Sequence, residues 1–374
     1  MNFEYTEEQI ALQDTLRRFF SRDYGFEHRR TVAASADGFD RSAWKTHAEL
    51  GLLALPFPSD QGGLDGSAID VQLVMELLGR GLALEPYLAT VVLCGSLIRD
   101  SATAAQREAV LPAIAGGEAL LALAHYEPGQ RYDSDRIATT ATRAGTGWRL
   151  DGAKAVVLGA PSADRFIVSA VAAEGLSLFL VDAGAPGLAV RAYPTQDGAR
   201  AGDLQLAGVE VAADALVGKA GDGLEAVERA LDHANAALCA EAVGIMGALN
   251  EITLEYLKTR KQFGVPIGKF QALQHRMADM VIATEQARSM ATLAAVRADS
   301  KDPAERRRAV SAAKAYVLQS ARLVGQQAVQ LHGGMGVTDE LIVSHYFKRL
   351  TMIGLTFGDM DFHLGRFSDS LLAA

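Results

Sequence analysis

The sequence predicts an α+β protein of several domains, in the order helices, β domain, helices. Its 374 residues hold two to three domains' worth of core at roughly 150 residues each. Apolar residues recur at helical spacing in both end regions, and short, often β-branched stretches bounded by Gly, Asp or Pro lie between them. We expect an N-terminal helical domain over 1–117, a middle antiparallel β domain over 118–222 and a C-terminal helical bundle over 223–374.

The N-terminal helices are expected from apolar residues at helical spacing. Residues 6–9 have the form of a capping box, which starts a helix. The apolar run 87–98 is too short to span a membrane, which takes about 20 residues, and predicts a buried helix. The other helices are expected over 44–53, 68–82 and 103–114.

Beyond residue 118 the pattern changes to short β stretches separated by turn residues, which is typical of an antiparallel sandwich or barrel. Past residue 223 the helical spacing returns and stays. Asp302 followed by Pro303 predicts a helix start, because Asp caps a helix and Pro is favoured at its first position. The β stretches are expected over 119–124, 137–142, 148–150, 154–158, 166–170, 176–181 and 203–211.

The composition argues against several classes of function. Thirty-six basic residues against 45 acidic ones give a net charge of −9 with no long basic stripe, so we expect no nucleic-acid partner. Cys94 and Cys239 lie far apart, which predicts neither a disulfide framework nor a metal site and fits a reducing cytoplasm. Residues 1–4 show no basic start of a secretory signal, and we expect no membrane contact.

Two segments carry candidate binding residues. The first, residues 260–271, has a basic pair, an aromatic residue and a glycine after a long helix, a set suited to an anionic phosphate. A basic helix end closed by glycine is the ordinary alternative. In the second, residues 330–336, the glycines either bring backbone N–H groups against a phosphate or form a tight turn. The 36 glycines as a whole raise the same question, whether they serve helix packing or ligand approach.

Together and in this order, the two segments resemble the acyl-CoA dehydrogenase family, and the likeness extends over essentially the whole chain. Other matching features are residues 6–9, the turn at 127–129 and the segment 150–154. The resemblance implies an N-terminal helical bundle, a middle β domain and a C-terminal four-helix bundle. The subgroup that the chain resembles most is the small subunit of pimeloyl-CoA dehydrogenase-type enzymes, through residues 85–93, 193–198 and 345–353.

The resemblance implies that the chain binds FAD at a boundary between subunits. In the family, FAD lies between the β domain and the C-terminal bundle and also touches the neighbouring subunit. The residues that match FAD-binding positions across this boundary are Arg260, Gln262, Phe263, Gln271, Gln330, Gly333 and Gly334.

The side of the site that faces the flavin ring departs from the family pattern. Tyr126 stands where a threonine usually bonds the flavin, and Tyr132 stands where a serine is expected. Val156 and Leu158 replace a tryptophan and a threonine. Either this flavin pocket is altered or empty, or backbone N–H groups make the bonds regardless of side chain, so that Tyr126 and Leu158 still contact FAD.

The catalytic base is the second departure. The reaction needs a carboxylate that removes the α proton of the acyl-CoA. The family carries a glutamate either in a stretch that aligns with residues 356–359 or at the position of Ala234, and neither position is acidic here. Asp359 and Glu241 are nearby candidates, although Asp359 could cap a helix and Glu241 could pair with an arginine. A base from another subunit is the preferred interpretation.

Asp232 and Asn235 align with residues that contact the CoA arm in relatives, although on a helix such residues are more often solvated. The histidines at 125, 275 and 332 have no nucleophile or carboxylate at triad spacing, so packing or capping roles are expected.

The resemblance therefore implies FAD-dependent α,β-dehydrogenation of an acyl-CoA, as in fatty-acid β-oxidation, with electrons passed to an electron-transfer flavoprotein. We expect one half of an α2β2 hetero-oligomer, beside a larger homologous subunit that supplies the base. A medium-chain dicarboxylyl-CoA such as pimeloyl-CoA is the expected substrate. Three alternatives stay open: a self-sufficient homo-oligomeric dehydrogenase, an acyl-CoA oxidase, and a non-catalytic scaffold that binds no flavin.

Overall fold

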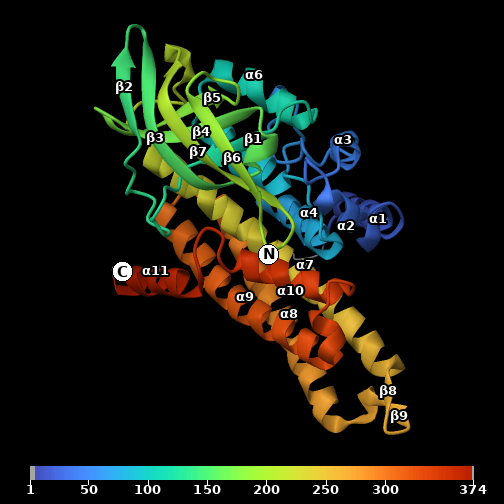
Figure 1. Ribbon diagram of the computed structural model, residues 1–374. Helices are drawn as coiled ribbons and strands as arrows, with labels where there is room; N and C mark the ends of the chain where they lie inside the picture. Colours follow the sequence, from blue (N-terminus) through green and yellow to red (C-terminus); the bar gives the residue numbers. More distant parts are fainter. Residues whose placement is uncertain (1–4, 373–374) are drawn as a thin grey trace. The chain divides into compact units, whose positions relative to one another are not determined.

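The computed structural model describes residues 5–372 (Figure 1). Residues 1–4, on which the expectation of no secretory signal rests, lie outside that range. The described chain divides into two compact units. The bundle unit takes in the chain up to Arg30, residues 68–83 and the chain from Asn235 on, and the sheet unit consists of residues 31–67 and 84–234.

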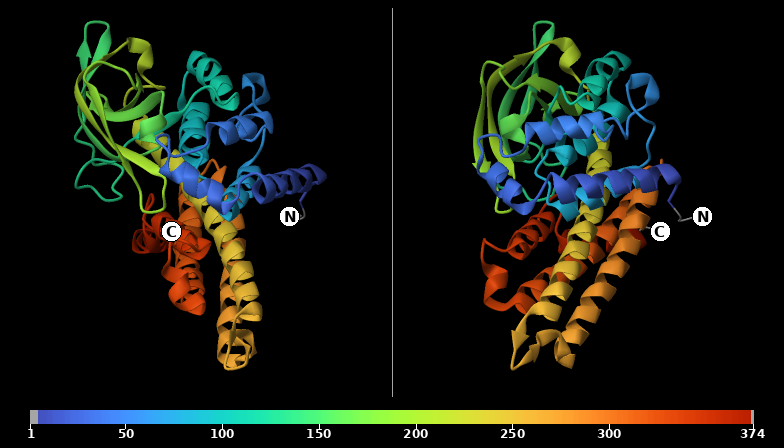
Figure 2. Two further views of the ribbon diagram at one scale, coloured as in Figure 1. Left: turned by 45° about the vertical axis from the view of Figure 1, so that its right-hand side comes forward. Right: turned by 90° about the vertical axis from the view of Figure 1, so that its right-hand side faces the viewer.

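The bundle unit is built on long helices, of which α8 (Gln271–Ala298) and α9 (Pro303–His332) pack along each other (Figure 2). The predicted helix starts are confirmed. Thr6 and Gln9 form a reciprocal capping box, and the Asp302 carboxylate accepts the N–H of Ala304 at 2.9 Å. The other helices of this unit are α1 (Glu7–Arg22), α4 (Ala68–Gly81), α10 (Ile342–Ile353), α11 (Met360–Leu372) and the larger part of α7 (Gly223–Thr259), and α2 (Phe26–Ala34) begins in it.

Helix α7 is buried along most of its length. Among the described residues it is the one helix that is long and apolar enough to cross a membrane, yet 78% of its apolar window is buried, as in a core helix. Two glycines explain part of this burial. A Cβ at Gly244 would lie 1.8 Å from the Glu76 carbonyl oxygen of α4, and one at Gly79 would lie 2.3 Å from the Glu241 carbonyl oxygen of α7. Helices α4 and α7 therefore touch through their backbones.

The sheet unit holds one mixed sheet, in the order β1-β4-β2-β3-β7-β6 with β5 also paired to β4. Hairpin neighbours are antiparallel, as expected, but β1 and β2 each run parallel to β4 because other chain segments intervene between the partners. The strands are β1 (Leu121–Ala124), β2 (Thr140–Ala144), β3 (Gly147–Leu158), β4 (Arg165–Ala172), β5 (Gly175–Asp182), β6 (Leu188–Pro194) and β7 (Arg200–Val211).

Two strands differ from the sequence-based expectation. The stretches 148–150 and 154–158 form one strand, β3, whose register with β7 shifts between Leu150 and Gly152 and again between Lys154 and Val157. Strand β6 was not expected, because most of its residues are exposed and no apolar alternation marks it.

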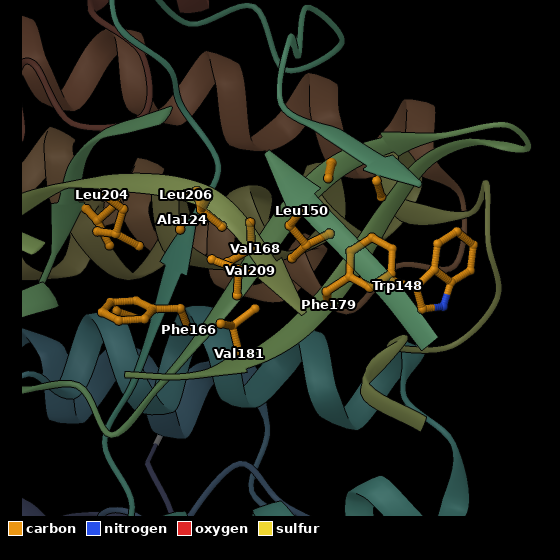
Figure 3. Packing of buried hydrophobic residues seen from close by; sticks show 14 of the residues in the cluster. Ala124, Trp148, Leu150, Phe166, Val168, Phe179, Val181, Leu204, Leu206 and Val209 are labelled. Carbon is orange, nitrogen blue, oxygen red and sulfur yellow. The ribbon is translucent and has the colours of Figure 1, made fainter. Parts of the chain in front are cut away.

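The core cluster of the sheet unit is formed by buried side chains of its own strands and of the turns between them (Figure 3). The Trp148 and Phe179 rings meet edge to face with centroids 5.2 Å apart. The expected buried helix at 87–98 is present, but it begins as a π-helix over Leu88–Gly95. The α-helices of this unit are α3 (Arg41–Glu49), α5 (Ser96–Ser101) and α6 (Ala104–Ala115).

Candidate functional site

The segment between α7 and α8 forms a short β-hairpin at the end of these two helices (Figure 2). Strand β8 (Lys261–Gln262) pairs with β9 (Val265–Pro266), and Phe263 and Gly264 between them both have positive φ, at 54° and 82°. Such a turn suits glycine and strains phenylalanine. The Phe263 side chain is nevertheless 90% exposed. Its contacts within the described chain therefore do not explain why an aromatic residue stands there.

The glycine-rich segment lies at the same end of the bundle unit. Helix α9 ends at His332, whose ring lies against the Tyr256 ring with centroids 4.4 Å apart, and Tyr256 is one turn before Arg260 on α7. The buried His332 thus joins the two predicted segments through packing, the role expected for it. The remaining predicted FAD residues on these segments, Gln262, Gln271 and Gln330, are exposed.

The glycines of this region serve two different purposes. A Cβ at Gly264, Gly333 or Gly334 would meet nothing within 4 Å, so their backbone lies open to an approaching ligand. A Cβ at Gly336 would lie 2.5 Å from the Val329 carbonyl oxygen. Close packing within a tight turn explains Gly336, the second of the two alternatives that the sequence left open for these glycines.

On the sheet unit, the predicted flavin-ring residues flank a strained bulge in β3. The Tyr126 carbonyl accepts the N–H of Ala155 at 2.8 Å, and Leu158 ends the same strand. Between them Val156 has φ 54°, unusual for a β-branched residue, and its side chain is 55% exposed. The Val156 N–H donates to Asp203 Oδ1 at 3.1 Å, which holds the bulge in place.

The Asp203 carboxylate is itself fixed from two sides. It accepts the Tyr193 hydroxyl proton at 2.8 Å and pairs with Arg191 at 2.5 Å. Burial of the phenol, together with its bond to Asp203, raises the pKa of Tyr193 to about 12. Tyr193 begins one of the segments that carry the subgroup resemblance, and the structure shows that it supports the Val156 backbone.

The turn at 127–129 and the segment 150–154, two of the features that carry the family resemblance, meet in a buried ion pair. The Lys154 ammonium, fully buried, donates to Glu127 Oε1 at 2.8 Å and to the His125 carbonyl and Ser169 hydroxyl at 3.1 Å. Burial lowers the pKa of Lys154 to about 8 despite this pairing. For Glu127, burial acts to raise the pKa, but hydrogen bonds from Lys154 and from Thr139 lower it to about 2. These motif residues are thus bonded to one another inside the sheet unit.

Both carboxylates proposed as a base have structural partners. Glu241 is buried and forms a fork with Arg349, from Nε at 2.5 Å and from Nη2 at 2.7 Å. Asp359 Oδ1 accepts the N–H of Phe362 at 2.9 Å and so caps helix α11. Pairing with an arginine and capping a helix are the non-catalytic roles that the sequence left open for Glu241 and Asp359.

The position where the family carries its C-terminal glutamate holds Phe357, again with positive φ, at 57°. Its carbonyl accepts bonds from Asn235 Nδ2 and His363 Nε2, both at 3.2 Å. Asn235, predicted to touch the CoA arm, is thus engaged with this loop. It and Asp232 are each 1% exposed, so the alternative that they are solvated is wrong.

The buried charges of the bundle unit that the sequence did not indicate include a lysine. Lys314 on α9 is fully buried, and its Nζ has no hydrogen-bond partner within the described residues. Burial lowers its pKa to about 8, while the nearby Cys239 and Glu241 act to raise it. The available signal was a lysine beside the apolar positions Ala313 and Val317 of a strongly periodic helix.

Comparison with known proteins places the chain in a family. Three family profiles match it along its length: the acyl-CoA dehydrogenase N-terminal domain over residues 6–118, the middle domain over 122–209 and the C-terminal domain over 221–372. The probable acyl-CoA dehydrogenase YngJ of Bacillus subtilis is 32% identical, and the match covers 93% of each chain. The chain belongs to the acyl-CoA dehydrogenase family.

Solved structures agree with this assignment. The Tcur3481-Tcur3483 steroid ACAD has a TM-score of 0.89 at 33% identity over 98% of each chain. The ChsE4-ChsE5 complex from Mycobacterium tuberculosis has a TM-score of 0.91 at 29% identity over 100% of each chain. PigA with FAD and proline has a TM-score of 0.91 at 26% identity over 99% of each chain. The protein is an FAD-dependent oxidoreductase of the acyl-CoA dehydrogenase type.

Proposed function

We propose that this chain is one subunit of an α2β2 acyl-CoA dehydrogenase whose larger homologous subunit supplies the glutamate base. One observation carries the proposal: Phe357 and Ala234 occupy the family's two base positions, and the neighbouring Glu241 and Asp359 are engaged in an ion pair and a helix cap. The similarity to the ChsE4-ChsE5 complex supports an assembly of two different chains.

In this assembly the hairpin and the glycine turn complete the FAD site of the partner subunit. The exposed Arg260 guanidinium is suited to the diphosphate, and the exposed Phe263 ring to the adenine side. The open backbone at Gly333 and Gly334 lets the pyrophosphate approach closely. These residues would hold and orient FAD, which when bound would supply the hydride acceptor for the acyl-CoA.

The substrate and the acceptor are proposed on similarity. A medium-chain dicarboxylyl-CoA such as pimeloyl-CoA is favoured by the subgroup segments, and a steroid acyl-CoA is the second candidate because a similar solved structure is named a steroid ACAD. We propose an electron-transfer flavoprotein as electron acceptor in fatty-acid β-oxidation, and the cytoplasm as the location.

The test compares the chain purified alone with the chain co-expressed with each homologous dehydrogenase of its own genome. We expect the single chain to be colourless and inactive, and the complex to be yellow, with fewer FAD molecules than subunits. A yellow, active homo-oligomer would contradict the proposal. Turnover with oxygen alone would indicate an oxidase instead, and a colourless complex would indicate a scaffold.

The hairpin gives a sharper test within the complex. Arg260→Gln removes a charge-assisted contact to the diphosphate, so we expect FAD affinity to fall about tenfold or more, with loss of activity that excess FAD restores. Lys258→Gln is the matched control, because Lys258 is exposed two residues earlier and pairs with Glu255 at 2.8 Å. Equal FAD content in the two variants would show that the hairpin holds no cofactor.

A further inference from the structure

A basic cleft lies in the bundle unit, away from the hairpin. Its volume is about 730 Å³, within the range of small-molecule sites, and its walls come from α1, α2, α4, α7 and α10. Glu251 marks its α7 wall, nine residues before Arg260, which is roughly 13 Å along a helix. The cleft is therefore separate from the predicted FAD residues.

The charge of the lining is strongly positive in a chain of net charge −9. Among the described lining residues, four are arginines and one, Glu251, is a carboxylate. Glu251 is already engaged, because its two oxygens form a fork with the guanidinium of Arg80. The exposed Arg17 and Arg18 form no ion pair within the described residues. Arg17 is available to an anion that enters the cleft, and so are the terminal nitrogens of Arg18, whose Nε donates to the Asp14 carbonyl at 3.1 Å.

Arg29 adds a buried positive charge to the same lining. It is 2% exposed, and its Nε donates to the Leu82 carbonyl at 2.9 Å. Its Nη1 lies 3.3 Å from His345 Nδ1, while His345 Nε2 lies 3.0 Å from the Asp339 carbonyl. The second bond needs a proton on Nε2, so Nδ1 accepts from Arg29 and the ring is neutral. Burial likewise lowers the pKa of His345.

Aromatic rings line the cleft beside these charges. Phe20 lies three residues after Arg17 on α1, hence on the same helix face, and meets the Tyr24 ring edge to face at 5.6 Å. Phe26 follows at the start of α2, half-buried. Arginines next to half-buried aromatic faces suit a ligand with a phosphate chain at one end and a planar ring at the other.

We propose that this cleft binds a nucleoside polyphosphate, with its phosphates on Arg17 and Arg18 and its base against Phe20 and Phe26. Such a site lies outside the dehydrogenase chemistry and would let the enzyme respond to a soluble nucleotide. The proposal does not depend on the hetero-oligomer, since every lining residue belongs to one unit of this chain.

The experiment measures ATP binding to the full-length chain by calorimetry, with tripolyphosphate and adenosine as partial probes. We expect one saturable ATP site per chain, weaker binding of either partial probe, and weaker ATP binding at higher salt. Arg17→Gln with Arg18→Gln should weaken ATP binding about tenfold or more. Both side chains are exposed, so the double variant should keep its fold, which its melting temperature checks.

Two controls locate the site. Arg22→Gln changes an exposed arginine of the same helix that pairs with Asp23 at 3.1 Å outside the cleft, and it should bind ATP like the parent chain. Arg260→Gln should also bind ATP normally. Loss of binding in Arg260→Gln with retention in the double variant would assign the nucleotide to the hairpin and overturn the proposal. An ATP titration that does not saturate would overturn the proposal as well. So would tripolyphosphate that binds as tightly as ATP does.

Discussion

Two lysines of this chain are buried, and their ammonium groups have different surroundings. Lys154 has a carboxylate, a hydroxyl and a carbonyl around its ammonium, whereas the ammonium of Lys314 has no hydrogen-bond partner within the described residues. A buried charge that is paired and hydrogen-bonded is tolerated, and one that is not costs stability. Removing the charge of Lys314 should therefore stabilise the fold, and removing the carboxylate charge that is paired with Lys154 should destabilise it.

Lys314→Met should stabilise the protein at neutral pH. The pKa of Lys314 falls from 10.5 when unfolded to about 8 when folded, so the folded chain holds this proton less tightly than the unfolded chain. Below pH 8 the lysine is protonated in both states, and the full difference lowers the free energy of unfolding. This corresponds to a cost of roughly 3 kcal/mol, which the variant removes. The parent's free energy of unfolding should rise with pH from about 8 to 10.5, and the variant's should lack this rise.

Urea unfolding at several pH values measures the effect. Lys301→Met is the matched control, since Lys301 is exposed just before α9 and its removal should change little. A Lys314→Met chain that is less stable than the parent at pH 7 would show that the ammonium is needed in the fold.

Glu127→Gln should have the opposite effect. Its folded pKa of about 2 lies below the ordinary 4.5, so the carboxylate stabilises the fold above pH 4.5 and this contribution is lost as the pH falls towards 2. The variant leaves Lys154 without its counter-charge, so we expect a loss of about 3 kcal/mol or more at neutral pH. Its stability should also depend less on pH between 4.5 and 2 than the parent's.

The denaturant midpoint across the acid range tests this, with the exposed Glu118→Gln as control. An unchanged midpoint for Glu127→Gln at neutral pH would mean that the pair contributes no net stability.

At the scale of elements, backbone contact between α4 and α7 makes one glycine far more important than its neighbour. Gly244→Ala would place a methyl group 1.8 Å from the Glu76 carbonyl oxygen, whereas the nearest atom to a Cβ at Gly247 is 4.0 Å away, on Arg80. We expect Gly244→Ala to lower the free energy of unfolding by roughly 3 kcal/mol or more, and Gly247→Ala to leave it equal or slightly higher. Thermal unfolding of the pair tests this, and equal melting temperatures would contradict close helix contact.

Local chemistry predicted many of the elements, because caps and periodicity are local. The Thr6 capping box and the Asp302-Pro303 start are both present. Strand β6 was not predictable from alternation, since its residues are mostly exposed. The electrostatic surroundings of Lys314 were not predictable either, because they include residues as distant in sequence as Glu241 and Arg349.

The candidate site likewise has a part that the sequence predicted and a part that it did not. The hairpin and the glycine turn were marked by residue types in a short span, and the structure brings them to one end of the bundle unit through Tyr256 and His332. The support of the Val156 bulge by Asp203 was not visible in the sequence, because 47 residues separate them. Local motifs thus identified the binding residues but not the contacts that position them.

At the scale of the whole molecule, the open question is which chain carries the base, and Asp359→Asn tests it with little risk to the fold. Asparagine caps a helix about as well as aspartate, so the bond to the Phe362 N–H and helix α11 should persist. If the base lies in the partner subunit, activity of the reconstituted complex should stay within about twofold of the parent. If Asp359 were the base, activity should fall by roughly 100-fold or more. Glu241→Gln cannot substitute for this test, because it would leave the half-buried Arg349 without its carboxylate and so confuse lost catalysis with lost stability.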